Sequence, residues 1–154
     1  MVIGAEDRLA KAGIELPPAV TPFGPYVPAV QTGRLLFLSG MLPTVGHEPR
    51  FVGRVGKELT VEDGRGAART AALNVIAVAK HHLGTLDRIS RMVRLGVYIA
   101  TGGPADLVRI ADGASELLRD VFGEGNMPAR LVFGVASLPF NTPVELEAMF
   151  EISE

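Results

Sequence analysis

Cysteine is absent from the 154 residues of this chain, and lysine is scarce. The absence of cysteine excludes disulfide bonds, thiol nucleophiles and thiolate metal sites together. Lysine contributes only 3 of the 15 basic residues, and arginine contributes the other 12. Such a bias is typical of bidentate anion recognition, because the guanidinium fork matches a carboxylate or a phosphate. A GC-rich genome would produce the same bias, so composition alone leaves both interpretations open.

Long apolar runs and clusters of positive charge are also lacking. No run reaches the ~18 apolar residues of a membrane-spanning helix. The first ten residues do not combine a basic segment with an apolar one, so they do not resemble a signal peptide. The formal net charge is −2 and no basic stripe is present, which argues against a dedicated nucleic-acid binder. We therefore expect a cytoplasmic protein without membrane or nucleic-acid partners.

Several frequent catalytic motifs are missing as well. No serine lies in a G-x-S-x-G sequence. The stretch 64–69 does not match the glycine fingerprint of dinucleotide-binding proteins, and we interpret it as the start of a helix. His81 and His82 follow Lys80 at a predicted helix end, where cations interact favourably with the helix dipole. His47 has no second ligand at a suitable spacing, so no metal site is predicted.

The residues that are present predict one domain with two long helices. Thr60 and Asp63 form a capping-box sequence, and Gly84 fits the position after the end of that helix. Pro104 and Gly123 bracket a second helix. The predicted elements are a short helix over 5–13, a Pro-rich extended segment over 17–28, a buried strand over 34–39, a loop over 43–57 with a short strand near 51–52, helices over 60–83 and 104–122, and strands over 89–99, 129–135 and 144–150.

The last two strands alternate with a period of two, so residues i and i+2 share a face. In the first of them we assign Arg130 and Val132 to the face that points away from the core. In the second, Glu145 and Glu147 point away from the core. The residues assigned to the core are Ala129, Leu131, Phe133, Val135, Val144, Leu146, Ala148 and Phe150. An arginine and a carboxylate are therefore expected on the same sheet surface, where they would suit a small anionic ligand and a bound water.

Two helices among mixed strands predict an α+β fold with both helices packed on one face of a mixed sheet. In the strand over 89–99 we assign Val93 and Leu95 to the covered face and Met92 to the other. The uncovered face mixes polar and apolar residues and is too apolar for solvent, so we predict a subunit interface there. Its residues are expected to include Tyr98, Met149, Val132, Gly96 and Met41.

Three short sequence blocks occur in order around this predicted core. They are Gly24-Pro25-Tyr26 continuing through Ala29-Val30 and Gly33 to Leu38-Ser39-Gly40, then Pro128-Ala129-Arg130, and then Leu138-Pro139 followed by Val144-Glu145-Leu146-Glu147-Ala148. With these blocks the chain resembles the Rid family of reactive intermediate deaminases, also called L-PSP endoribonucleases. The similarity covers residues 24–151 of the single domain, and residues 1–23 form an N-terminal extension.

The resemblance implies a chorismate-mutase-like fold and a homotrimer with ligand clefts between its subunits. It also implies hydrolytic deamination of 2-imino or enamine acids to 2-keto acids and ammonia, without a cofactor. Arg130 matches the arginine that binds the substrate carboxylate, and Glu147 matches the glutamate that orients the attacking water. Tyr26, Ser39 and Gly40 match positions that line the cleft.

Three residues depart from the pattern of the family. Val132 stands two residues after Arg130, where the deaminases often carry a cysteine, and it is expected to contribute mainly its backbone to substrate binding. Met41 replaces a common glutamine, and Asp112 replaces an asparagine, so an acid stands where it could repel a carboxylate. These departures, together with the long 44–57 loop, indicate a divergent subgroup.

Three functions remain open from the sequence. In a deaminase, Arg130 would hold the carboxylate through a charge-assisted bidentate pair, and Glu147 would accept a proton from water. A non-catalytic trimer would bind a small carboxylate with the same arginine. An endoribonuclease is disfavoured, because basic and aromatic residues do not interleave as strand binding requires. Arg130 and Glu147 could also simply pair at a subunit interface, and Glu145 is expected to be structural.

Overall fold

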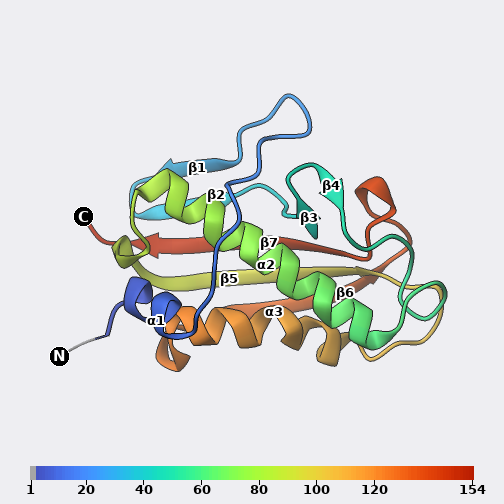
Figure 1. Ribbon diagram of the computed structural model, residues 1–154. Helices are drawn as coiled ribbons and strands as arrows, with labels where there is room; N and C mark the ends of the chain where they lie inside the picture. Colours follow the sequence, from blue (N-terminus) through green and yellow to red (C-terminus); the bar gives the residue numbers. More distant parts are fainter. Residues whose placement is uncertain (1–2) are drawn as a thin grey trace.

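The computed structural model describes residues 3–154 as a five-stranded mixed sheet with two long helices on one face (Figure 1). The helices are α1 (Ala5–Lys11), α2 (Val61–Leu83) and α3 (Leu107–Phe122). The strands are β1 (Ala29–Thr32), β2 (Leu35–Leu38), β3 (Thr44–Val45), β4 (Glu48–Pro49), β5 (Ile89–Ala100), β6 (Ala129–Val135) and β7 (Val144–Ile152). The predicted α+β class and the placement of both long helices are confirmed. Within the described residues, no helix combines the length and hydropathy needed to cross a membrane.

The sheet has the order β1-β2-β7-β5-β6. All neighbouring strands are antiparallel except β5 and β6, which are parallel. A parallel pair needs a long crossover, and α3 provides it. The last strand in sequence, β7, is therefore inserted at the centre of the sheet, and β6 lies at one edge. A separate two-stranded pair, β3-β4, forms within the 44–57 loop.

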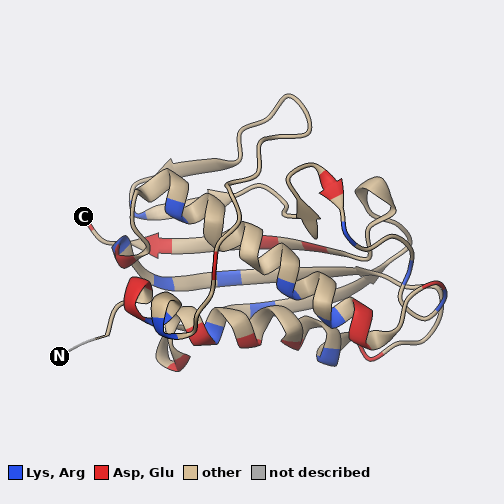
Figure 2. Cartoon of the chain, viewed as in Figure 1, with Lys and Arg blue, Asp and Glu red and all other residues tan. Residues whose placement is uncertain are grey.

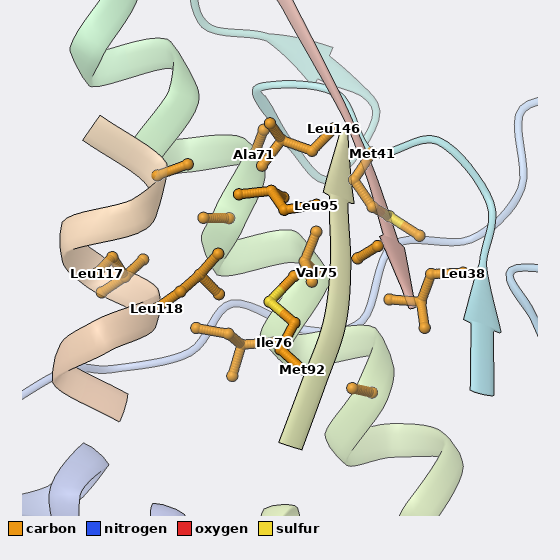
Figure 3. Packing of buried hydrophobic residues seen from close by; sticks show 14 of the residues in the cluster. Leu38, Met41, Ala71, Val75, Ile76, Met92, Leu95, Leu117, Leu118 and Leu146 are labelled. Atoms are coloured by element: carbon orange, nitrogen blue, oxygen red, sulfur yellow. The ribbon is translucent and has the colours of Figure 1, made fainter. Parts of the chain in front are cut away.

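The core lies between the helices and the covered face of the sheet. Small residues on α2 let it approach β7 and α3 closely, since Ala67, Ala71 and Ala72 are fully buried. Figure 3 shows Leu117 and Leu118 of α3 and Ile76 of α2 packed toward Leu95, Met92 and Leu146 of the sheet. Burial of this kind contributes about 25 cal/mol per Å² of apolar surface.

Both long helices begin at side-chain caps. Thr60 accepts a hydrogen bond from the backbone of Asp63, and the Asp63 carboxylate accepts one from the backbone of Thr60. Gly84 ends α2 with φ +83°, a conformation that favours glycine. These boundaries confirm the prediction for α2. The prediction that α3 begins at Pro104 is wrong, because the Asp106 carboxylate caps the helix and Leu107 is its first residue.

The short helix predicted over 5–13 is confirmed as α1. Ala5 and Leu9 are buried against the body of the domain. The Glu6 carboxylate pairs with Lys80 at 2.9 Å and accepts the backbone N–H of Leu86 at the same distance. The segment that precedes the resemblance is therefore packed on α2 and α3 as part of the domain.

Two strand predictions are wrong. The short strand expected near residues 51–52 is absent from the described structure, and the two-residue strands lie earlier in the same loop. Met92 is buried, not on the open face, because irregularities in the pairing of β5 with β7 reverse its orientation. The edge strand β1 was not expected, since the sequence there reads as the end of a Pro-rich segment.

The face assignment of β6 is also wrong. Arg130 lies opposite Leu95, and Val132 lies opposite Val97, in the parallel pairing with β5. Leu95 and Val97 face the helices, so Arg130 and Val132 face the helices too. Residues with apolar side chains occur on both faces of β6. This edge strand is also partly exposed on each face, so no face stands out as buried. Periodicity alone therefore could not identify the covered set.

The open face of the sheet combines charged and apolar residues, as predicted, but some of the residues on it differ from those we expected. Phe37 and Phe133 are exposed there, and Tyr98 lies beside Phe133 with ring centroids 6.4 Å apart. Figure 2 shows acidic residues along β7 and basic residues along β5. Met41 and Val132, which we expected on this face, are instead directed into the core.

Candidate active site

A hollow of about 500 Å³ lies where the Pro-rich segment, the segment after β2 and the start of β7 meet. Tyr26, Ser39 and Gly40 all line it, so the structure brings together these three predicted site residues. The other lining residues are Phe23, Gly24, Pro25, Leu42, Pro139, Phe140 and Glu145. The hollow is thus mainly apolar, with one carboxyl group among its walls.

Hydrogen bonds from the segment after β2 fix this arrangement. The Ser39 hydroxyl donates to the carbonyl of Val27 at 2.6 Å, and the Ser39 backbone N–H donates to Pro28 at 2.9 Å. Met41 and Leu146 of β7 exchange two backbone hydrogen bonds, at 2.8 and 2.9 Å. Ser39 therefore joins the segment after β2 to the Pro-rich segment, and Met41 joins the segment after β2 to β7.

A buried amide supports the same wall from behind. Asn74 of α2 is 1% exposed. Its Nδ2 donates to the carbonyls of Leu42 and Thr44, at 2.9 and 2.8 Å. A buried polar side chain of this kind is costly unless its hydrogen bonds are made, so it specifies the path of the backbone it holds. Asn74 therefore fixes the position of Leu42 in the hollow.

Glu145 is the acid of the hollow. Its side chain is partly buried, and burial raises the pKa of its carboxyl, with no cation of residues 3–154 offsetting that effect. A Cβ added at Gly40 would lie 2.9 Å from the Glu145 carboxyl carbon and from Oε2. Glycine at position 40 therefore leaves the space in which this carboxyl packs against the backbone.

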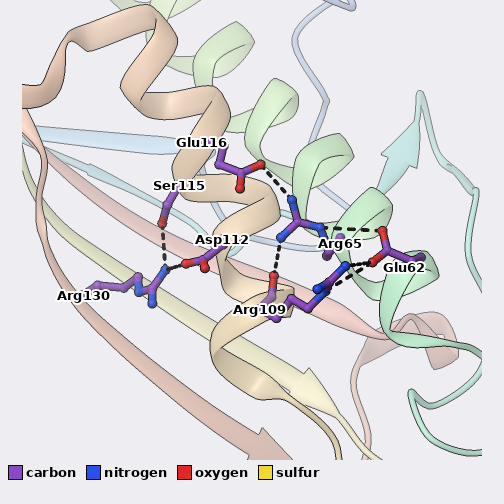
Figure 4. A network of polar contacts seen from close by, with 7 residues as sticks. All are labelled: Glu62, Arg65, Arg109, Asp112, Ser115, Glu116 and Arg130. Atoms are coloured by element: carbon purple, nitrogen blue, oxygen red, sulfur yellow. Dashed lines mark hydrogen bonds and ion pairs between the residues drawn. The ribbon is translucent and has the colours of Figure 1, made fainter.

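Arg130 lies outside the hollow, against α3 (Figure 4). Its Nη1 donates to Oδ1 of Asp112 at 2.7 Å and to Oγ of Ser115 at 3.0 Å. Its side chain remains 25% exposed, and its other guanidinium nitrogens make no hydrogen bond within residues 3–154. Asp112 and Ser115 therefore orient this arginine.

Glu147 also lies outside the hollow. It pairs with Arg94 on the open face of the sheet, where Nε and Oε1 are 3.2 Å apart. Arg130 faces the helices, so the expectation that Arg130 and Glu147 project from one sheet surface is wrong. Val132 packs against the core beside Arg130 and does not line the hollow.

Sequence reasoning missed Glu145, Phe23 and Phe140 among the residues of the hollow. Glu145 was expected to be structural, yet it is the glutamate that joins Tyr26, Ser39 and Gly40. Glu145 and Glu147 share a face, and only the long-range pairing of Met41 with Leu146 distinguishes them. For Phe23 and Phe140 the only signal in the sequence is the proline that precedes each of them. That proline predicts a turn but does not indicate a binding site.

This geometry suits a small cationic or hydrogen-bonding group next to Glu145. A carboxyl whose pKa is raised exchanges protons more readily near neutral pH than an ordinary glutamate does. The Tyr26 hydroxyl accepts the backbone N–H of Phe23 at 3.1 Å and keeps its own proton available for donation. No three side chains of a metal-ligating type gather within residues 3–154.

Comparison with known proteins gives consistent matches along nearly the whole chain. The family model described as "YjgF/chorismate mutase-like, putative endoribonuclease" matches residues 6–151, and so begins within the segment that we set apart as an N-terminal extension. Protein TCP17 of Trypanosoma cruzi is 40% identical over 148 residues, which cover 95% of this chain and 92% of that protein.

Two further matches are a named enzyme and a solved structure. A 2-iminobutanoate/2-iminopropanoate deaminase of Dermatophagoides farinae is 32% identical over 139 residues, covering 90% of this chain and 94% of that protein. The crystal structure of Atu1372, a protein of unknown function from Agrobacterium tumefaciens, has a TM-score of 0.87 and 36% identity, and the match covers 97% of this chain and 92% of that one. The chorismate-mutase-like fold expected from the three sequence blocks is confirmed.

Proposed function

Because the chain belongs to the YjgF/Rid family, we propose that it hydrolyses reactive 2-imino or enamine acids to 2-keto acids and ammonia. The observation that carries the proposal is the partly buried Glu145 carboxyl, held against Gly40 in one hollow with Tyr26 and Ser39. The deaminase name of the Dermatophagoides relative supports it. No cofactor is required by this reaction.

In the proposed mechanism, Glu145 takes the role that the sequence resemblance gave to Glu147. The Glu145 carboxylate removes a proton from water as the water oxygen bonds to C2 of the iminium, and the C=N π electrons move to nitrogen. Protonated Glu145 then donates to the amino nitrogen, the C–N bond breaks and ammonia leaves. The hydroxyl proton passes to the departing ammonia as the C=O bond forms, so one iminium and one water give one 2-keto acid and one ammonium ion.

Arg130 is proposed to bind the substrate carboxylate from a neighbouring subunit of a homotrimer. Within one chain, Arg130 and Glu145 lie on opposite faces of the sheet, with β5 between their strands. The apolar residues on the open sheet face support an assembly that would cover them. Asp112 leaves part of the Arg130 guanidinium free, so a substrate carboxylate would bind at the remaining N–H groups.

The test generates 2-imino acids with an amino-acid oxidase and follows their capture by semicarbazide. Wild-type protein should lower the captured imine. Arg130→Ala and Glu145→Gln should each lose about 100-fold or more in rate, the scale expected for a general base. Glu147→Gln is the matched control, because its side chain lies two residues away on the same face, and it should retain most activity.

Other results would redirect the assignment. Activity lost in Glu147→Gln but kept in Glu145→Gln would return the catalytic role to Glu147. Wild type without effect on any imine would reject the reaction.

The pairing of Arg130 with Asp112 favours a second candidate, a trimer that binds small carboxylates without turning them over. That protein would bind 2-keto acids through Arg130 while leaving imines unchanged. An endoribonuclease would instead show RNA affinity that falls steeply with salt.

A further inference from the structure

Aromatic side chains form the rim of the hollow above Glu145. Phe23 and Tyr26 come from the Pro-rich segment, and Phe140 comes from the short turn before β7. The Phe23 and Phe140 rings have centroids 4.9 Å apart and are tilted by 49°. Within one chain Phe140 is 53% exposed and Tyr26 is 46% exposed, so apolar ring surface lines the hollow on the side where a ligand would enter. Exposed apolar surface gathered at one cavity is typical of a binding site.

The backbone at Phe140 is held in a conformation that a bulky residue rarely adopts. Phe140 has φ +58° and Asn141 has φ +57°, both in the left-handed region. Thr142 holds this turn, since its hydroxyl donates to the carbonyl of Pro139 at 2.8 Å. The backbone N–H of Gly53 donates to the Asn141 carbonyl at 2.8 Å. Strain of this kind persists where the surroundings enforce it, and it recurs at ligand-binding sites.

The 44–57 loop supports the other side of the rim. The His47 ring stacks on Phe23, with centroids 4.2 Å apart and planes 29° from parallel. His47 Nε2 lies 2.8 Å from the Thr21 hydroxyl and 3.0 Å from the Thr21 carbonyl. The 44–57 loop thus holds Phe23 in place at the hollow.

We infer that the hollow prefers an aromatic side chain on its ligand, so that its preferred substrates are the 2-imino acids derived from aromatic amino acids. The volume of about 500 Å³ far exceeds what a methyl-bearing acid needs, and the rim supplies ring faces and edges for a ligand ring. The imino nitrogen would lie toward Glu145, below the ring. The assignment of an imine rests on the proposed function, whereas the preference for a ring rests on the rim alone.

The test measures binding of two 2-keto acids to the intact protein by titration calorimetry. Phenylpyruvate should bind at least about tenfold more tightly than pyruvate, as differences in apolar pocket filling allow. Phe140→Gly removes the ring but suits the left-handed turn, so it should fold normally and lose that preference. Phe140→Tyr should keep the preference. Val108→Ala is the control, because it shortens an exposed apolar residue on α3. It should keep the preference for phenylpyruvate.

A parallel kinetic arm separates this inference from the proposed reaction. Wild type should show a higher kcat/KM for the imine made from phenylalanine than for that made from alanine, and Phe140→Gly should remove the difference. Equal binding of both keto acids to wild type, or a preference that survives in Phe140→Gly, overturns the inference. Preferred binding of phenylpyruvate without any imine turnover rejects the reaction and supports the aromatic subsite.

Discussion

Two glutamates on one face of β7, Glu145 and Glu147, have different environments. Glu147 pairs with Arg94 across the open sheet face. Glu145 lies two residues earlier, where the Ser39–Gly40 segment covers it and no cation of residues 3–154 compensates its burial. An unpaired carboxyl in an apolar hollow is a poor contributor to stability but a suitable proton acceptor.

The raised pKa of Glu145 predicts a pH-dependent gain in stability for Glu145→Gln. Below the ordinary pKa of 4.5 the carboxyl is protonated in both the folded and the unfolded chain. As pH rises through the raised pKa, the folded chain must ionise a desolvated group, and the stability contributed by the protonated form is lost. Glutamine removes that loss, so the free energy of unfolding of the variant relative to wild type should increase from pH 4 to pH 7.

Urea unfolding at fixed protein concentration measures this difference. Glu147→Gln is the control. Its free energy of unfolding should fall by up to about 1 kcal/mol, because the exposed ion pair with Arg94 is lost, and it should show no relative gain at pH 7. A Glu145→Gln variant whose relative stability is the same at pH 4 and pH 7 would contradict the environment described here.

Residue types indicated much of the site before its geometry was known. Tyr26, Ser39 and Gly40 were predicted from the sequence blocks, and the structure brings them together. The choice between Glu145 and Glu147 depended on which residue of β7 meets the segment after β2. That pairing joins positions about one hundred residues apart, and a local pattern carries no information on it.

At the scale of the elements, α2 and α3 approach so closely that one glycine controls their distance. A Cβ added at Gly113 of α3 would clash with the backbone oxygen of Arg65 on α2. Backbone cannot yield as the end of a flexible side chain can. Gly113 is therefore needed for helix–helix contact, although glycine is a poor helix former.

Gly113→Ala should destabilise the domain for this reason. Alanine gains about 1 kcal/mol of helix propensity, but forcing the helices apart costs about 1–3 kcal/mol, so the net effect is a lower midpoint of thermal unfolding. Gly125→Ala is the matched control, because an added Cβ there meets nothing within 4 Å, and it should unfold at nearly the wild-type temperature. An unchanged or raised midpoint for Gly113→Ala would show that the helices can separate without cost.

Helix boundaries with their own side-chain caps were the most predictable elements. The capping box at Thr60 and the glycine at 84 locate α2 in the sequence, and the structure has the same limits. Strand orientation was less predictable. In β6 both faces contain apolar residues, and in β5 irregular pairing turns Met92 into the core. Such irregularities arise from the partner strand and leave no local signal.

At the scale of the whole molecule, the sheet order separates the two charged groups that the proposed reaction needs. Glu145 is on the central strand β7 and faces the open side, whereas Arg130 is on the edge strand β6 and faces α3. No side-chain rotation carries Arg130 through the sheet. If both groups act on one substrate, they must come from different subunits, and the exposed Phe37 and Phe133 mark a face that another copy would cover.

This arrangement predicts that two inactive variants restore activity when they assemble together. Arg130→Ala retains Glu145, and Glu145→Gln retains Arg130, so a cleft built from one subunit of each kind contains both intact groups. Random mixing in equal amounts gives an intact arginine and an intact glutamate in roughly a quarter of the clefts, and thus roughly a quarter of the wild-type rate per cleft. Co-expression followed by the imine-capture assay measures this rate, with each variant purified alone as the control. A mixture as inactive as its components would mean that the two groups do not act together from different subunits. Because the sheet prevents them from acting together within one subunit, that result would remove Arg130 or Glu145 from the mechanism.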